Sequence, residues 1–219
     1  MTGNRRLQRK LTATRRDLAQ QRVLASRDSL TGLANRPAIE AELSRRLGGD
    51  AAFALFLLDL DGFKPVNDAY GHPAGDIVLA EVAHRLVNGP ADLDVVGRLG
   101  GDEFVVISDA PMWMAQHAQG PAIRAAIARP ISVDGGVWVT VSASVGLLQV
   151  RPGDELGDVL RSVDAALYRA KAAGGDVVVD FGSGPLLTAD ENRPGLRLRD
   201  AHPNRVPDEQ ALLLVRAGR

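Results

Sequence analysis

A pair of glycines between two β-type runs constrains the fold of this chain most strongly. Gly100-Gly101 separates an apolar run that ends at Leu99 from a second run that begins at Phe104. Adjacent glycines supply the positive φ angles of a two-residue hairpin turn, so we expect strands at about 94–99 and 103–108. Asp102 and Glu103 then stand at the start of the returning strand. Two adjacent carboxylates repel each other and need a counter-charge, which a bound cation would supply.

A second β-type run also ends in carboxylates. Residues 51–58 are continuously apolar, which is typical of a central strand buried on both faces, and Asp59-Leu60-Asp61 follows directly. If this strand lies beside the hairpin, the two ends form an oxygen-only cluster suited to Mg²⁺ or Mn²⁺. The sequence therefore suggests metal-assisted phosphate chemistry.

The remaining periodicities alternate between helix and strand. Apolar spacing predicts helices over about 37–47, 75–87, 112–128 and 154–173, a polar loop from the end of the buried strand through Gly71, a long strand over 137–148 and a short strand at 177–179. From the pattern alone, this order predicts an α/β fold.

Five separated motifs carry a resemblance to a known family. They are Asp28-Ser29-Leu30-Thr31-Gly32-Leu33-Ala34-Asn35-Arg36, Asp59-Leu60-Asp61-Gly62-Phe63-Lys64-Pro65-Val66-Asn67-Asp68, Gly71-His72-Pro73-Ala74-Gly75-Asp76, residues 100–104 and Tyr168-Arg169-Ala170-Lys171. In order and spacing, residues 28–181 resemble the diguanylate cyclase (GGDEF) domain. The resemblance implies a mixed central sheet flanked by helices, similar to the ferredoxin-like palm of nucleotide cyclases.

The resemblance also implies an activity. A diguanylate cyclase condenses two GTP into cyclic di-GMP and two pyrophosphates, and it works as a homodimer because each domain holds one GTP. Each ribose 3′-hydroxyl attacks the α-phosphate of the other nucleotide with the help of two Mg²⁺ or Mn²⁺ ions. By resemblance, Asp59, Asp102, Glu103 and the Leu60 carbonyl hold metal, and Glu103 also assists deprotonation of the hydroxyl. An alternative from another class is a degenerate domain that binds GTP or cyclic di-GMP without turnover.

The same resemblance assigns the substrate contacts. Lys64 and Lys171 would neutralise the β- and γ-phosphates, and Gly100 and Gly101 would let the nucleotide lie against bare backbone.

Asn67 and Asp76 would bind the guanine edge, where a carboxylate accepts from both N1–H and the exocyclic amine. Each assignment has a plainer alternative. Asp76 would cap the helix that begins near Ile77, Asp59 would end a strand, Asp102 and Glu103 would sit in a solvated turn, and the lysines would lie on the surface.

Two departures from the family pattern carry expectations. A product-binding inhibitory site often reads Arg-x-x-Asp before the double glycine, and here Ala91 replaces the arginine although Asp94 remains. We therefore expect no inhibitory Arg-x-x-Asp site. After Lys171 the family commonly reads Gly-Arg-Asn, whereas this chain has Gly174-Gly175-Asp176. The missing guanidinium at Gly175 would weaken GTP binding.

The two ends of the chain differ in character from the domain between them. Residues 1–27 carry eight Arg or Lys and one Asp, lack Gly and Pro from residue 5 onward, and form an imperfect heptad seam. This pattern fits a weak coiled-coil linker about as well as a lone helix. In the family, such a helix links a sensor to the catalytic domain. Residues 182–219 are rich in Pro and Gly and read as a tail or linker.

Composition narrows the class of protein further. The absence of cysteine excludes a disulfide framework or a thiolate metal site. No apolar run approaches the roughly 18 residues of a membrane span, and the N-terminus lacks the apolar core of a signal peptide. We expect a cytoplasmic protein, or the cytoplasmic piece of a longer one with an upstream sensor or membrane domain. Nucleic acid is not an expected partner, because the basic arm has no interleaved aromatic residues.

Overall fold

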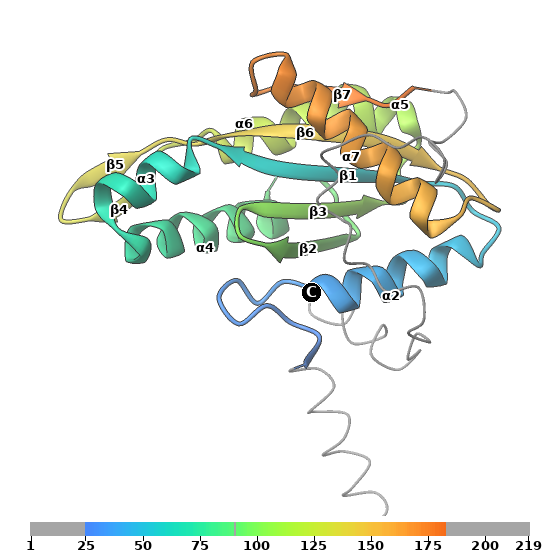
Figure 1. Ribbon diagram of the computed structural model, residues 1–219, viewed down its shortest axis with the longest axis horizontal. Coiled ribbons are helices and arrows are strands. Elements are labelled where there is room, and N and C mark those ends of the chain that lie inside the picture. Colours follow the sequence, from blue (N-terminus) through green and yellow to red (C-terminus); the bar gives the residue numbers. More distant parts are fainter. Residues whose placement is uncertain (1–24, 90, 183–219) are drawn as a thin grey trace, which may run out of the picture.

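The computed structural model describes residues 25–89 and 91–182, which fold around a five-stranded mixed sheet of order β2-β3-β1-β6-β7 (Figure 1). The sheet strands are β1 (Phe53–Asp61), β2 (Val95–Gly100), β3 (Glu103–Ser108), β6 (Ser142–Val150) and β7 (Val178–Asp180), and a separate pair holds β4 (Ile131–Asp134) and β5 (Val137–Val139). The helices are α2 (Arg36–Leu47), α3 (Phe63–Tyr70), α4 (His72–Asn88), α5 (Met112–Met114), α6 (Gly120–Ile127) and α7 (Leu156–Ala172), with a π-helical segment η1 (Ala115–Gln119). The predicted α/β class with a mixed, helix-flanked sheet is confirmed.

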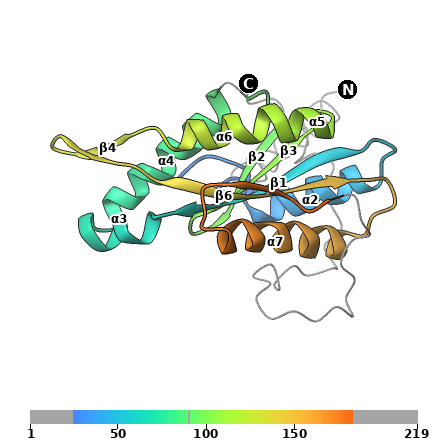
Figure 2. The ribbon, with the colours of Figure 1, turned by 90° about the horizontal axis from the view of Figure 1, so that it is seen from above.

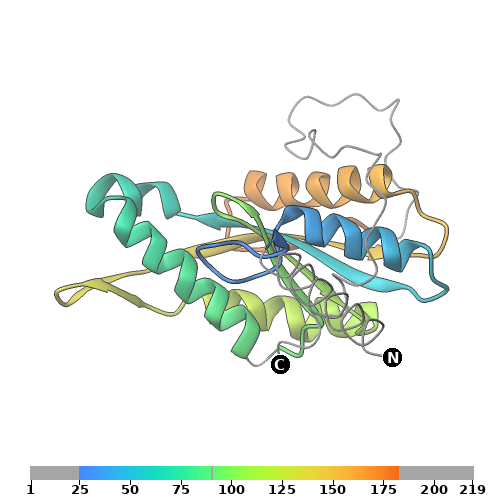
Figure 3. The ribbon, with the colours of Figure 1, turned by 90° about the horizontal axis from the view of Figure 1, so that it is seen from below.

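Strand β1 lies at the centre of the sheet, antiparallel to both β3 and β6. Its first eight residues are all buried, because helices cover both faces. Alternate residues such as Phe56 and Leu58 face the core under α4 and α6, whereas Leu55 and Leu57 face the core under α2 and α7. Figures 2 and 3 show these two helical layers on opposite sides of the sheet. The buried central strand predicted from the apolar run is confirmed.

The segment after β1 is a helix, so the prediction of a polar loop through Gly71 is wrong. Helix α3 buries Phe63 and Val66, one helical turn apart, and leaves its other side polar. Two positive-φ glycines bound it, Gly62 at +81° and Gly71 at +80°. Helix α4 then begins at His72. Asp76 therefore lies within α4, and its interpretation as the N-cap of a helix starting near Ile77 is wrong.

The long strand predicted over 137–148 is divided into two strands with different partners. β5 pairs with β4, a strand the sequence analysis missed, and β6 pairs with β1. The alternation continues through the break because Val139, Val141 and Ala143 all face the same core. Figure 2 shows the β4 end of this hairpin reaching beyond the central sheet. A period of two reports which side chains face inward and carries no information on the partner strand.

The helix predicted over 112–128 also departs from regularity. It is interrupted by the π-helical segment Ala115–Gln119, directly before Gly120-Pro121. Pro121 has no backbone N–H to continue the α-helical ladder, which favours a local change of helix type there.

The hairpin between β2 and β3 forms as predicted, but its turn lies one residue later. Gly100 is paired with Glu103, so the two turn residues are Gly101 and Asp102. A register shift between Arg98 and Gly100 causes the displacement. Both glycines still have positive φ, +142° at Gly100 and +54° at Gly101. The need for glycine at both positions is confirmed.

Of the ends of the chain, the structure describes little. The predicted N-terminal helix lies outside the described residues except for its last three positions, and so does nearly all of the predicted tail 182–219. Within residues 25–89 and 91–182, none of the helices combines the length and apolarity needed to cross a membrane.

Candidate active site

The carboxylates predicted to cooperate lie at one end of the sheet. Asp59 on β1 is directly opposite Glu103 on β3, and the backbone N–H of Leu60 donates to the carbonyl of Asp102 across 3.2 Å. Two neighbouring antiparallel strands thus bring both acidic motifs together, as the sequence predicted. Their assignment as metal ligands stays a prediction.

Asp59 is buried and holds a cation from the same chain. It is only 5% exposed, and its Oδ2 lies 2.6 Å from the ammonium Nζ of Lys171 on α7. Burial raises the pKa of Asp59 above its ordinary value; the hydrogen bond from Lys171 opposes this, while the charges of Asp102 and Asp61 raise the pKa further. The carboxylates of Asp102 and Asp61 thus add negative charge around Asp59, which favours a bound cation.

The donor chemistry at Asp59 fits a hard divalent cation. Its donors are oxygen atoms, which Mg²⁺ and Mn²⁺ prefer, and the Lys171 ammonium stands where positive charge is stabilised. As placed, no three His, Asp or Glu side chains of residues 25–89 and 91–182 converge into a ready metal-binding group. Lys171, predicted to meet phosphate, is instead paired with the predicted metal ligand.

Two arginines that the sequence analysis did not single out hold the β2–β3 turn. The Arg98 guanidinium donates to the Gly101 carbonyl from Nε at 3.0 Å and Nη2 at 2.8 Å, and its Nη1 lies 3.0 Å from Asp28 Oδ1. Arg36, at the start of α2, donates from Nε to the Leu99 carbonyl at 3.3 Å. The available signals were that Arg36 ends the first of the five motifs and that Arg98 lies two residues before Gly100-Gly101.

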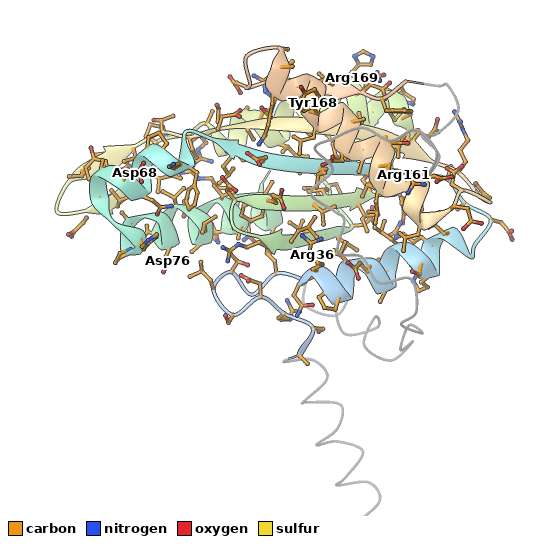
Figure 4. The ribbon with its side chains drawn as sticks, in the orientation of Figure 1. Arg36, Asp68, Asp76, Arg161, Tyr168 and Arg169 are labelled. Carbon is orange, nitrogen blue, oxygen red and sulfur yellow. The ribbon has the colours of Figure 1, made fainter. Side chains whose placement is uncertain are left out.

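Arg36 also approaches the predicted catalytic base. Its Nη2 lies 3.9 Å from Oε2 of Glu103, and both side chains are largely shielded from solvent. Figure 4 shows Arg36 at the beginning of α2, next to the β2–β3 hairpin. The guanidinium thus supplies positive charge beside Glu103.

The residues predicted to bind guanine are carried by two helices in close contact. Asn67 lies on α3 and the exposed Asp76 on α4; a Cβ added at Gly75 would come within 2.0 Å of Asn67 Oδ1. Gly75 therefore permits the close approach that brings Asn67 next to the turn of α4 containing Asp76. Figure 4 shows Asp76 and Asp68 at this end of the molecule. Lys64 is exposed on α3.

The positions of the expected inhibitory motif have other surroundings. Ala91 packs against the core under α4 and α6, and Asp94 Oδ2 accepts a hydrogen bond from the backbone N–H of Asp109 at 2.6 Å. Asp94 therefore has a structural partner within the loop after β3.

Comparison with known proteins identifies relatives of this chain and of its fold. The family model described as "Diguanylate cyclase, GGDEF domain" matches residues 25–176. The diguanylate cyclase DgcP of Pseudomonas aeruginosa is 40% identical over 164 residues, covering 73% of this chain and 24% of DgcP. An uncharacterized protein of Mycobacterium bovis, Mb1389c, is 38% identical over 202 residues, covering 90% of this chain and 32% of that protein. The chain thus spans about a third or less of the length of these curated relatives.

A solved structure agrees with these sequence matches. The coiled coil and GGDEF domain of DgcB from Caulobacter crescentus, determined in complex with c-di-GMP, superposes with a TM-score of 0.72 at 29% identity. The match covers 82% of this chain and 100% of that one. With the family model matched over most of the chain, and with the two acidic motifs adjacent in the fold, this protein belongs to the family of the diguanylate cyclase GGDEF domain.

Proposed function

We propose that this chain is an active diguanylate cyclase, which condenses two GTP into cyclic di-GMP and releases two pyrophosphates. The observation that carries the proposal is the pairing of Asp59 with Glu103 at the end of two adjacent strands, with Asp102 in the turn between β2 and β3. Family membership supports the same activity.

The proposed cofactor is Mg²⁺ or Mn²⁺, two ions per site. Asp59, Asp102, Glu103 and the Leu60 carbonyl would hold them, consistent with the buried, cation-binding carboxylate of Asp59. Bound there, the ions would supply charge neutralisation for the phosphates and a lower pKa for the attacking hydroxyl.

The chain's own residues perform the remaining tasks. Glu103 accepts the proton of the ribose 3′-hydroxyl, and Arg36 supplies positive charge beside it. Lys171 leaves Asp59 for the β- and γ-phosphates, joined by Lys64 from α3. The backbone of Gly100 and Gly101 lies against the nucleotide, where a side chain would obstruct it.

The base is selected by the two helices after β1. Asp76 accepts from N1–H and the exocyclic amine of guanine, and Asn67 adds a further hydrogen bond, a pattern that adenine does not match. The proposed substrate is therefore GTP.

Two domains must meet for the reaction, because each site holds one nucleotide and the product contains two. We propose a homodimer working in the cytoplasm, where GTP is available. The second candidate is a degenerate domain that binds nucleotide without turnover. The observation favouring it is Gly175, which leaves the turn after α7 without the arginine common in the family.

The test is turnover of labelled GTP with Mg²⁺ over a range of protein concentrations. Asp102→Ala and Glu103→Gln should each lower the rate by about a hundredfold or more. Asp134→Ala, an exposed carboxylate on the β4–β5 hairpin, should leave the rate unchanged. Product formation that rises faster than linearly with protein supports the dimer. GTP binding without product at high protein concentration would favour the degenerate domain.

A further inference from the structure

Asp61, the last residue of β1, has no task in the proposed chemistry, yet its carboxylate is fully engaged. The hydroxyl Oγ of Ser144 lies 2.8 Å from Oδ1 and 2.9 Å from Oδ2. The backbone N–H of Asp176 donates to Oδ2 at 2.9 Å. Ser144 belongs to β6, and Asp176 to the turn between α7 and β7. One carboxylate thus ties β1 to its neighbouring strand and to the end of α7.

The backbone of this turn lies directly against Asp61. Gly175 has φ +79°, and a Cβ added there would lie 3.0 Å from Asp61 Oδ2 and 3.1 Å from its Cγ. Glycine alone allows both the conformation and the close approach. The contact between the turn and Asp61 therefore depends on glycine at position 175, where the family commonly has arginine.

The turn is also bonded to the last residues of α7. The N–H of Gly174 donates to the Lys171 carbonyl at 3.1 Å, and the N–H of Gly175 donates to the Ala170 carbonyl at 3.2 Å. Any displacement of the turn is thereby passed to the backbone that carries Lys171. Asp59 and Asp61 lie two residues apart, on the same face of β1, so α7 is held at two neighbouring points of one strand.

A further ion pair reaches the turn from the opposite helical layer. Arg124 of α6 donates from Nε to Asp176 Oδ1 at 3.0 Å, and its Nη2 lies 2.8 Å from the same oxygen. Both side chains are partly exposed, so this pair contributes little compared with the contacts at Asp61.

We propose that Asp61 is a positioning residue: by anchoring the turn after α7, it holds the Lys171 ammonium beside Asp59, from where that ammonium reaches the phosphates of GTP. The contact of Lys171 with phosphate rests on the proposed function. The placement of Lys171 does not depend on it.

A test that needs no nucleotide uses the small number of lysines. The chain has three, Lys10, Lys64 and Lys171, and Lys64 is an exposed internal reference. Trace acetylation with acetic anhydride, read by mass spectrometry, gives the rate at Lys171 relative to Lys64. Asp61→Asn keeps the shape of the side chain and removes its charge and one acceptor. We expect it to raise the ratio about fivefold, because Lys171 is released from Asp59.

Two glycine variants test whether a change in the acetylation ratio comes from the contact between Asp61 and the turn. Gly175→Ala pushes the turn away from an intact Asp61 and should raise the ratio to a similar extent. Gly153→Ala introduces comparable backbone strain at φ +87°, in the turn before α7, with no atom within 4 Å of the new Cβ. This control should leave the ratio unchanged. An unchanged ratio in both Asp61→Asn and Gly175→Ala, or an equal rise in Gly153→Ala, overturns the inference.

Steady-state kinetics then test the link to substrate. Asp61→Asn should raise KM for GTP about fivefold and change kcat by less than about twofold, because Lys171 binds the ground state and transition state alike. In a Lys171→Ala background, Asp61→Asn should have no further effect on KM for GTP. If the double variant instead raises KM by the product of the two single-variant factors, Asp61 does not act through Lys171. If wild-type protein makes no cyclic di-GMP while the acetylation ratio responds as expected, the cyclase proposal fails and the placement of Lys171 by Asp61 stands.

Discussion

The guanidinium of Arg98 bridges Asp28, at the entry to the domain, and the carbonyl of Gly101, in the β2–β3 turn that also contains Asp102. Its Nη1 lies 3.0 Å from Asp28 Oδ1, while Nε and Nη2 both donate to Gly101. Asp28 also accepts from the backbone N–H and hydroxyl of Thr31. The loop around Asp28 is thus bonded to the β2–β3 turn through one side chain.

The acid stability of the domain should depend on Asp28. Burial alone would raise the pKa of this carboxyl, but the hydrogen bonds from Thr31 and Arg98 outweigh burial and lower the pKa below its ordinary value. A lowered pKa contributes stability that is present above the unfolded pKa and is lost as pH falls through the folded one. Asp28→Asn should therefore cost about 1 kcal/mol of unfolding free energy near pH 7.

The difference between wild type and Asp28→Asn should shrink below about pH 3.9, the ordinary pKa of an aspartate. Urea titrations of both proteins at a series of pH values measure this difference in unfolding free energy. A difference that stays constant down to pH 2 would show that the charge of Asp28 does not contribute to the stability of the fold.

Base selection should depend on Asp76. Asp76→Ala removes the carboxylate proposed to accept from guanine, so we expect KM for GTP to rise about tenfold while any turnover of ATP changes little. Competition between labelled GTP and unlabelled ATP measures the ratio of kcat/KM for the two nucleotides. Asp68→Ala, an exposed carboxylate on neighbouring α3, is the matched control and should retain wild-type selectivity. Equal loss for both nucleotides would remove Asp76 from base recognition.

Replacing Gly175 with the arginine that is common in the family should not strengthen GTP binding by this chain. Gly175→Arg forces an L side chain into φ +79° against the Asp61 carboxylate, so we expect a lower melting temperature and no decrease in KM for GTP. Gly153→Arg, with open space around its Cβ, should lower the melting temperature less. A tighter KM for GTP in Gly175→Arg would show that the turn readily adapts to a side chain.

Product inhibition at the Arg-x-x-Asp position should be weak. Ala91 supplies no guanidinium for a phosphate, and Asp94 is bonded to the backbone of Asp109. We expect the initial rate of GTP turnover to be insensitive to added cyclic di-GMP at concentrations well below KM for GTP. Calorimetry with cyclic di-GMP and the Asp94→Ala variant locates any binding that does occur. A larger dissociation constant for cyclic di-GMP in Asp94→Ala than in the wild type would contradict the prediction.

The packing of α7 on the sheet should depend on Gly146. A Cβ there would lie 2.5 Å from both the Leu167 amide nitrogen and the Val163 carbonyl oxygen, which are backbone atoms of α7. Gly146→Ala should destabilise the domain by about 3 kcal/mol or more, since helix and strand must separate. Gly48→Ala, at the exposed end of α2 with its nearest neighbour 3.6 Å away, should be nearly neutral. Chemical denaturation of the two variants compares them.

Much of the site could be read from local patterns. The apolar run before Asp59 predicted a buried strand, and the glycines before Asp102 predicted a hairpin; both predictions are confirmed because strand burial and positive φ leave local signatures. Helix α3 was missed because only Phe63 and Val66 of its eight residues are buried, so its apolar signal is brief. The β4–β5 pairing was missed because alternation does not name a partner strand.

The sequence by itself determined the α/β class, the central strand, the glycine turn and the identity of the acidic residues at the strand ends. Only the tertiary structure decided that Lys171 lies on Asp59, that Arg36 approaches Glu103 and that Asp61 holds the turn at Asp176. The physical reason is separation along the chain. The atoms of Asp61 and Asp176 that meet at 2.9 Å belong to residues 115 positions apart, and periodicity within a window of 10 to 20 residues reports which way a side chain faces but not what it meets.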